Sequence, residues 1–320
     1  MKAAVYTGYG APDVVRITEI ERPAVKDNEL LVKVHATTVN RTDCAYRSAK
    51  PFVNRLFTGL VKPRATVLGT EFAGVVTAIG SAVTSYPVGE RVFGFSARGG
   101  AHAEYLSIPQ DGPLATMPSN STFEQAAPGT EAAHYALSLI RAAKLHKGQD
   151  VLVNGATGGI GSAAVQLLRV LGANVTAVCG TEHVELVRGL GAGRVIDYTA
   201  EDFTKDDRTY DVILDAVGKS TFGRCRRVLR PGGIYLSSEL GPLSQNPLLA
   251  LITPVLGGKR VKFPIPKHGP EIVRHFQQLM ESEQFRPLID RRYPLDQIVE
   301  AYRYVDTGQK IGNVVLNVEP

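Results

Sequence analysis

The fold of this chain is decided by the stretch Val151-Leu152-Val153-Asn154-Gly155-Ala156-Thr157-Gly158-Gly159-Ile160-Gly161. An apolar run leads into clustered glycines, and the following residues, 160–171, repeat their apolar side chains at helical spacing. A strand, a tight glycine turn and a helix in this order are typical of a site that holds a pyrophosphate at a helix N-terminus.

The glycines fit two spacings of a dinucleotide-binding fingerprint. Read as GxGxxG, the string has Ala156 in the first position; read as GxxGxxG, it is complete at Gly155, Gly158 and Gly161. In both, Gly158 lets the backbone approach the pyrophosphate and Gly161 lets the helix pack on the strand. A purely structural turn is the alternative. We predict a dinucleotide cradle made of Gly155, Ala156, Thr157, Gly158, Gly159, Ile160 and Gly161.

Strands and helices alternate on both sides of this cradle. Strands are expected at 150–153, 174–178, 194–196, 210–215 and 233–236, and helices at 160–171, 183–190 and 220–229. Such alternation predicts right-handed crossovers and a doubly wound parallel sheet of the α/β class, covered on both faces.

The first third of the chain has a different pattern, with short strands expected at 2–6, 14–19, 29–38, 72–79 and 89–95 and few helical signals. Regular glycines between these strands favour a partly open β-barrel. After residue 264 we expect helices at 271–283 and 295–304 and a closing strand at 313–318, which periodicity alone does not assign to either part.

Composition bounds the class of protein. The chain has 320 residues, 44% hydrophobic and 21% charged, which fits two folded domains and excludes intrinsic disorder. No apolar run approaches the roughly 20 residues of a membrane span, and the N-terminus lacks a signal-peptide core, so we expect a cytoplasmic protein. Three isolated cysteines suggest neither a disulfide framework nor a thiolate zinc site.

The net charge of +5 does not by itself indicate nucleic-acid binding. The densest basic cluster lies in the expected helix 220–229 and just after it, at Arg224, Arg226, Arg227 and Arg230. No aromatic interleaving or recognition motif accompanies it, so a solvated helical face is the favoured interpretation over a nucleic-acid patch.

Cofactor choice depends on the residues at the end of the strand expected at 174–178. NAD selection usually places a carboxylate there, whereas this chain has Gly180 and Thr181. We predict NADPH, with Thr181, His183 and Arg188 near the 2′-phosphate; Glu182 keeps NADH open as the alternative. Ser237 ends a later strand at the expected cofactor edge, where its hydroxyl could bind ribose or carboxamide.

Several segments together resemble the medium-chain dehydrogenase/reductase superfamily, in its zinc-independent quinone oxidoreductase-like branch. They are Val39-Asn40-Arg41-Thr42-Asp43, Leu68-Gly69-Thr70-Glu71-Phe72-Ala73-Gly74-Val75-Val76, Val88-Gly89-Glu90-Arg91-Val92, the cradle, Gly189-Leu190-Gly191-Ala192 with Asp197-Tyr198, Tyr210-Asp211-Val212-Ile213-Leu214-Asp215 and Arg230-Pro231-Gly232-Gly233. The resemblance implies a GroES-like catalytic domain (1–122), an inserted Rossmann NADPH-binding domain (123–263) and a C-terminal return that completes the catalytic domain (264–320). It also implies a homodimer and a cofactor contact at Tyr198.

Departures from the zinc-dependent relatives indicate the chemistry. Where those relatives carry Cys and His ligands, this chain has Asn40 and Thr70, and residues 93–105 lack the cysteines of a structural zinc lobe. Without a Lewis acid, reduction of an activated acceptor is easier than dehydrogenation of an alcohol. The resemblance therefore implies a small hydrophobic substrate, either a quinone or an α,β-unsaturated carbonyl.

Three residues are the candidates for catalysis. Asn40 can donate a hydrogen bond to a carbonyl oxygen, Tyr46 can wall the substrate or donate a proton, and Glu131 can relay a proton if it is buried. The alternatives are an Asn that holds a turn, a core or surface Tyr, and a Glu favoured by a helix dipole. A zinc-type alcohol dehydrogenase and an NADPH-binding interaction protein with little turnover remain the alternative functions.

Overall fold

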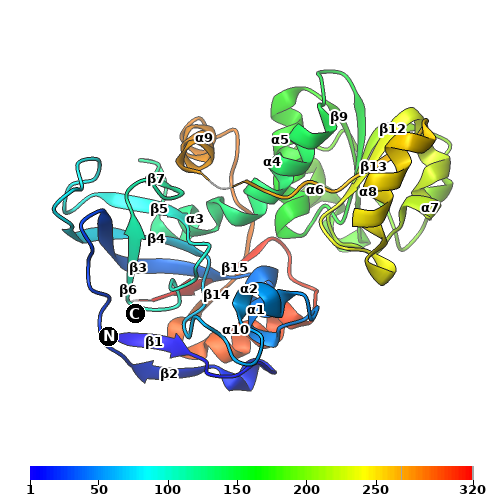
Figure 1. The fold of residues 1–320 in the computed structure, drawn as a ribbon. Helices are drawn as coiled ribbons and strands as arrows, with labels where there is room; N and C mark the ends of the chain where they lie inside the picture. Colours follow the sequence, from blue (N-terminus) through cyan, green and yellow to red (C-terminus); the bar gives the residue numbers. More distant parts are fainter. Residues whose placement is uncertain (268, 319–320) are drawn as a thin grey trace. The chain divides into compact units, whose positions relative to one another are not determined.

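The computed structural model describes residues 1–267 and 269–318. By its internal contacts the chain divides into unit 1, Met1–Glu131 with His268–Pro320, and unit 2, Ala132–Lys267 (Figure 1). The chain leaves unit 1 once, builds unit 2 without interruption and then returns.

Unit 2 is built on a six-stranded parallel sheet in the order β10-β9-β8-β11-β12-β13. The strands are β8 (Asp150–Asn154), β9 (Asn174–Cys179), β10 (Arg194–Asp197), β11 (Tyr210–Asp215), β12 (Leu229–Ser237) and β13 (Arg260–Lys262). The helices are α4 (Glu131–Ala143), α5 (Gly159–Leu171), α6 (Val184–Leu190), α7 (Phe222–Cys225) and α8 (Gln245–Leu256), and they flank the sheet (Figure 1). The first strand, β8, lies centrally, and its residues 151–153 are fully buried, as a doubly wound sheet requires.

The predicted helix over 220–229 is wrong in extent. Helix α7 ends at Cys225, a 3₁₀ turn follows at Arg226–Val228, and β12 begins at Leu229. The Arg230 guanidinium forms ion pairs with Asp211, 2.6 Å from Nη1, and with Asp150, which hold this stretch against the sheet. The four arginines therefore do not share one helical face.

Unit 1 is built on a second sheet in the order β14-β15-β3-β4-β5-β7, with β6 paired to β3 and a separate β1-β2 hairpin. The strands are β1 (Lys2–Val5), β2 (Arg16–Glu19), β3 (Glu29–Val39), β4 (Glu71–Ile79), β5 (Arg91–Phe95), β6 (Tyr105–Pro109), β7 (Leu114–Thr116), β14 (Ile289–Pro294) and β15 (Asn313–Asn317). The closing strand β15 pairs antiparallel with β3, Val314 opposite Val39, so the end of the chain completes the sheet of its first third.

The helices of unit 1 are α1 (Arg41–Ser48), α2 (Asn54–Thr58), α3 (Phe123–Ala126), α9 (Pro270–Glu281) and α10 (Ile298–Asp306). The expectation of few helices in the first third missed α1 and α2. Asn40 caps α1 by accepting a hydrogen bond from Asp43 N at 2.9 Å, and Asp43 Oδ2 accepts from Asn40 N at 3.1 Å. This reciprocal cap is readable in the sequence as Asn40 with an acidic residue three positions later.

Candidate active site

Two glycines of the cradle are required by the chain's own packing. Gly155 has a φ of +79°, and a Cβ there would lie 2.7 Å from the Cβ of Val217. A Cβ on Gly161 would lie 2.1 Å from the Gly155 carbonyl oxygen. These contacts bring the first turn of α5 close against the end of β8.

Gly158 differs, because nothing in the protein excludes a side chain there. Its backbone is extended, and the nearest atom to an added Cβ is 3.7 Å away. It is the N-cap of α5 but contributes no capping side chain, so the first N–H groups of this 13-residue helix remain for an outside acceptor. The turn from Gly155 to Gly161, with Ala156 buried and Thr157 and Ile160 half-buried, therefore fits a pyrophosphate that the backbone approaches closely.

The end of β10 places a carboxylate beside the tip of β9, a contact that sequence reasoning missed. Thr181 Oγ1 donates to Asp197 Oδ2 at 2.6 Å and lies 2.8 Å from Thr199 Oγ1. The hydrogen bond from Thr181 holds the pKa of Asp197 below its usual range, so this carboxylate is charged. Asp197 ends β10 beside Cys179 of β9, a proximity that only the strand pairing shows.

The structure brings the predicted phosphate contacts near one another. Tyr198 is exposed and lies close to Gly180. A Cβ added to this glycine would be 3.3 Å from the Tyr198 hydroxyl oxygen. Gly180 is the N-cap of the 3₁₀ turn Thr181–His183, which ends at the half-buried His183.

Ser237 ends β12 at the same carboxyl edge of the parallel sheet as Asn154 and Asp215. Its hydroxyl accepts from Glu239 N at 3.1 Å, whereas the neighbouring Ser238 Oγ is buried without a hydrogen-bond partner among the described residues. A buried hydroxyl without a partner is costly unless a bound polar group satisfies it. This edge therefore also fits a polar ligand.

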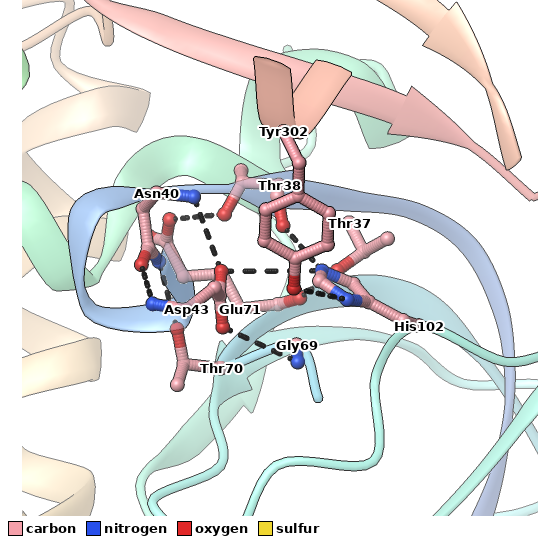
Figure 2. Close-up of polar contacts among 9 residues, drawn as sticks. All are labelled: Thr37, Thr38, Asn40, Asp43, Gly69, Thr70, Glu71, His102 and Tyr302. Atoms are coloured by element: carbon pink, nitrogen blue, oxygen red, sulfur yellow. Dashed lines mark hydrogen bonds and ion pairs between the residues drawn. The ribbon is translucent and has the colours of Figure 1, made fainter. Parts of the chain in front are cut away.

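The candidate catalytic cluster of unit 1 is built around the start of α1. Asn40 is buried, and its Nδ2 donates to Thr70 Oγ1 at 2.8 Å (Figure 2). Because an amide nitrogen carries two N–H groups, this bond uses one donor and leaves a second for another acceptor.

Glu71 ties this cluster to the N-terminus of α4. Its fully buried carboxylate accepts hydrogen bonds from Thr38 Oγ1 (2.7 Å), from Thr130 N and Oγ1 (3.1 and 2.9 Å) and from Glu131 N (2.6 Å). Burial raises the pKa of Glu71, and these donors oppose the rise. Glu71 is thus a scaffold group that fixes Thr70 and Glu131 relative to each other.

Glu131 and Tyr46 lie in one electrostatic neighbourhood. Glu131 is buried, and burial, followed by the charge of Glu71, raises its pKa well above the ordinary value. The Thr42 hydroxyl hydrogen-bonds its carboxyl group, and Tyr46, one turn further along α1, has a pKa raised by burial and then by the Glu131 charge. Both side chains therefore favour their protonated, proton-donating forms.

Lys310 is a neighbour that sequence reasoning missed. Its charge opposes the pKa rise of Glu131, and its Nζ donates to the Gly312 carbonyl oxygen. No motif marks Lys310; the pairing of β15 with β3 brings the segment before β15 beside the start of α1.

Asp43 and His102 form a buried polar pair behind the cluster. Asp43 accepts from Gly69 N at 3.2 Å, and its Oδ2 lies 3.9 Å from His102 Nε2. His102 Nε2 donates to the Thr38 carbonyl oxygen at 2.7 Å, and Nδ1 lies 3.4 Å from the Tyr302 hydroxyl (Figure 2). Burial raises the pKa of Asp43 to about 8 and lowers the pKa of His102 to about 4. Every polar atom discussed here contacts protein, which indicates a structural role.

The donor set at the Asn40 position does not fit a zinc ion. Zinc in proteins is bound by thiolate, imidazole and carboxylate groups, whereas Asn40 and Thr70 present an amide and a hydroxyl that are bonded to each other. Within residues 1–267 and 269–318, no three or more His, Cys, Asp or Glu side chains gather as ligands of one metal would.

Comparison with known proteins gives two family matches. The family described as alcohol dehydrogenase GroES-like domain matches residues 26–119, and the family described as zinc-binding dehydrogenase matches residues 190–316. The 2-methylene-furan-3-one reductase of Solanum lycopersicum is 31% identical over 100% of this chain and 80% of its own length. The chain belongs to the medium-chain dehydrogenase/reductase superfamily.

Two further relatives place the chain within this superfamily. The chloroplastic NADPH-dependent alkenal/one oxidoreductase of Arabidopsis thaliana is 31% identical over 99% of this chain and 79% of its own. The quinone oxidoreductase structure from Coxiella burnetii superposes with a TM-score of 0.89 at 25% identity, over 100% of this chain and 99% of the other. The predicted family, its quinone oxidoreductase-like branch and the two-part α/β fold are confirmed.

Proposed function

We propose that this superfamily member is an NADPH-dependent reductase that delivers a hydride to a quinone or an α,β-unsaturated carbonyl without a catalytic zinc. The observation that carries the proposal is the 2.8 Å hydrogen bond from Asn40 Nδ2 to Thr70 Oγ1. Hydrogen-bond donors occupy the positions where zinc relatives carry ligands, and donors suffice for an acceptor whose developing charge is already delocalised. The names of the alkenal/one and quinone oxidoreductases support the same class of acceptor.

The cofactor would be held by unit 2. The turn from Gly155 to Gly161 would bind the pyrophosphate with backbone N–H groups, and Ser237 would contact ribose or carboxamide. Gly180, Thr181, His183 and Tyr198 would receive the 2′-phosphate, with NADH as the weaker alternative. When bound, the nicotinamide supplies the hydride.

The chain's own groups would stabilise and protonate the acceptor. The second N–H of Asn40 would donate to the carbonyl oxygen as negative charge develops there, and Thr70 and Glu71 would keep the amide oriented. Tyr46 and Glu131, whose pKa values are raised by burial, would supply the proton that completes the reduction.

The domain roles and the assembly are part of the same proposal. Residues 1–122 and 264–320 would form the catalytic domain and 123–263 the cofactor domain of a cytoplasmic homodimer. Helix α8 supports a dimer, because it exposes a row of large apolar side chains beside the edge strand β13 and carries no charged residue. Those side chains are Leu248, Leu251, Ile252, Val255 and Leu256.

The experiment is a turnover assay with the purified full chain. NADPH and NADH oxidation are followed at their absorbance band with a panel of quinones, alkenals, enones and simple ketones, with and without a chelator, alongside metal analysis. We expect NADPH oxidation by quinones or enones that the chelator leaves unchanged. Alcohol oxidation that requires stoichiometric zinc would contradict the proposal, as would tight NADPH binding with no oxidation by any acceptor.

A further inference from the structure

One surface of unit 1 exposes apolar side chains that its own fold holds outward. We define the apolar loop as residues 50–64, which include α2 (Figure 1). Its large exposed side chains are Phe52, Val53, Leu56, Phe57, Leu60 and Val61. Phe57 is 72% and Val61 87% exposed, whereas monomeric surfaces usually carry such residues singly.

These apolar residues surround a short helix and do not form one helical face. Helix α2 covers only Asn54–Thr58, and Gly59, with a φ of +129°, ends it before Leu60 and Val61. Residues 52–61 nevertheless expose six large apolar side chains close together in the chain, a cluster that a protein surface normally covers.

The base of the loop is fixed by specific contacts. The Tyr9 hydroxyl donates to the Gly59 carbonyl oxygen at 2.6 Å and contacts Thr58 Oγ1 at 2.8 Å, and Arg64 N donates to the Thr58 carbonyl oxygen at 2.8 Å. The Arg55 guanidinium lies 5.0 Å from the centre of the Tyr9 ring. The apolar side chains are therefore presented from an anchored base.

The charge of the loop selects the partner. Lys50, Arg55, Lys62 and Arg64 are its only charged residues, so cations precede and follow the apolar residues in the chain and the loop contains no carboxylate. A second copy meeting the same face would place like charges together, which disfavours a symmetric contact. Apolar side chains bordered by cations match the interface of an anionic bilayer, where apolar groups enter the acyl boundary and lysines meet headgroups.

We propose that the apolar loop docks this protein peripherally on anionic lipid surfaces. No helix in the described part of the chain has the length and apolar character needed to cross a membrane, so the contact would lie in the interfacial plane. The proposal concerns binding alone and does not depend on the reaction proposed above.

The test uses the absence of tryptophan from this chain. Phe57→Trp in the whole chain introduces a single reporter in the apolar loop. Vesicles of phosphatidylcholine with about a third phosphatidylserine should shift its emission to the blue and protect it from aqueous quenchers, and salt should reverse the effect. Pure phosphatidylcholine vesicles should bind far more weakly. Val88→Trp, at another exposed apolar position of unit 1, should show no change.

Charge removal provides the matched variant. Lys62→Ser with Arg64→Ser in the Phe57→Trp background should weaken binding to anionic vesicles by about 25-fold, from about fivefold per cation. An emission that neither vesicle type alters would overturn the proposal and favour a protein partner with an acidic groove. Equal binding with and without the two cations would overturn it as well. Because no turnover is measured, failure here is distinct from failure of the proposed function.

Discussion

The cradle of unit 2 and the Glu71 carboxylate of unit 1 differ in how their polar groups are satisfied. In unit 2 the cradle leaves the first N–H groups of α5 without a capping side chain, and Ser238 Oγ has no partner among the described residues. In unit 1 Glu71 is fully buried and accepts four hydrogen bonds from the protein. The cradle therefore has N–H groups left for a ligand, whereas the Glu71 carboxylate is fully bonded within the protein and serves as scaffold.

The largest expected effect separates the two kinds of cradle glycine. Gly161→Ala places a Cβ 2.1 Å from the Gly155 carbonyl oxygen, so we expect about 1–3 kcal/mol of destabilisation and loss of NADPH binding. Gly158→Ala meets no protein atom closer than 3.7 Å, so its thermal midpoint should remain that of the unsubstituted chain while NADPH binding weakens. Thermal melts and cofactor titrations measure both. Equal destabilisation by the two variants would contradict the interpretation that Gly158 serves the ligand.

The second prediction separates the donor role of Asn40 from its capping role. Serine caps helices about as well as asparagine, so Asn40→Ser should keep α1 folded while it removes the amide. Loss of one oxyanion donor typically lowers turnover by 100-fold or more, and we expect kcat/KM for an enone to fall by about 100-fold.

The control for this variant is Asn40→Ala, which should lose the same activity and about 1 kcal/mol of stability through the missing cap. Steady-state kinetics and urea unfolding provide the two readouts. Unchanged kcat/KM in Asn40→Ser would assign Asn40 to the scaffold alone.

The sequence predicts unit 2 better than unit 1 for a physical reason. In a parallel sheet, strand, turn and helix are neighbours in the chain, so the apolar run at 151–153 and the glycines after it describe one local structure. The expected helix 220–229 is longer than the observed one because arginines are good helix formers, whereas the ion pairs of Arg230 with Asp150 and Asp211 leave no trace in the local sequence pattern.

Residues of the candidate site that sequence reasoning missed depend on long-range pairing. Asp197 meets Thr181 only because β10 pairs with β9, and Lys310 approaches Glu131 only because β15 pairs with β3. Spacing along the chain carries no signal for either contact. By contrast, the spacing of Asn40 and Asp43 does indicate a helix N-terminus. The β-rich pattern of the surrounding sequence favours strands there instead.

A smaller effect tests whether the negative charge of Asp197 weakens NADPH binding to unit 2. The Asp197 carboxylate is ionised and bonded to Thr181, so it should repel a 2′-phosphate nearby. Asp197→Asn should lower the KM for NADPH by up to about fivefold, the effect of roughly 1 kcal/mol, and leave the KM for NADH nearly unchanged. Low ionic strength should enlarge the difference. Equal changes for both cofactors would place the 2′-phosphate away from this carboxylate.

The last prediction concerns the buried Asp43–His102 pair of unit 1 and follows from proton linkage. The pKa of Asp43 is raised by burial from 3.8 to about 8, so the folded state binds its proton more tightly and the free energy of unfolding falls as pH rises through this range. The pKa of His102 is lowered by burial from 6.5 to about 4, so this group makes stability rise with pH between those values. The two effects oppose each other between about pH 4 and 6.5, and of these two groups only Asp43 still changes stability above pH 6.5.

Substitution of Asp43 or His102 should therefore leave the pH dependence of stability that the other residue produces. Between pH 6.5 and 8, Asp43→Asn should flatten the fall in unfolding free energy by at most about 1.4 kcal/mol per pH unit, the value for one proton. In His102→Gln the free energy of unfolding should instead begin to fall near pH 4, because no histidine effect opposes that of Asp43. Burial also raises the pKa of Glu71 and Glu131, so the fall is reduced in Asp43→Asn but not abolished. Urea unfolding at pH 5, 6.5 and 8 measures the slopes, and identical slopes above pH 6.5 in Asp43→Asn and the unsubstituted chain would show that Asp43 is ionised in the folded protein.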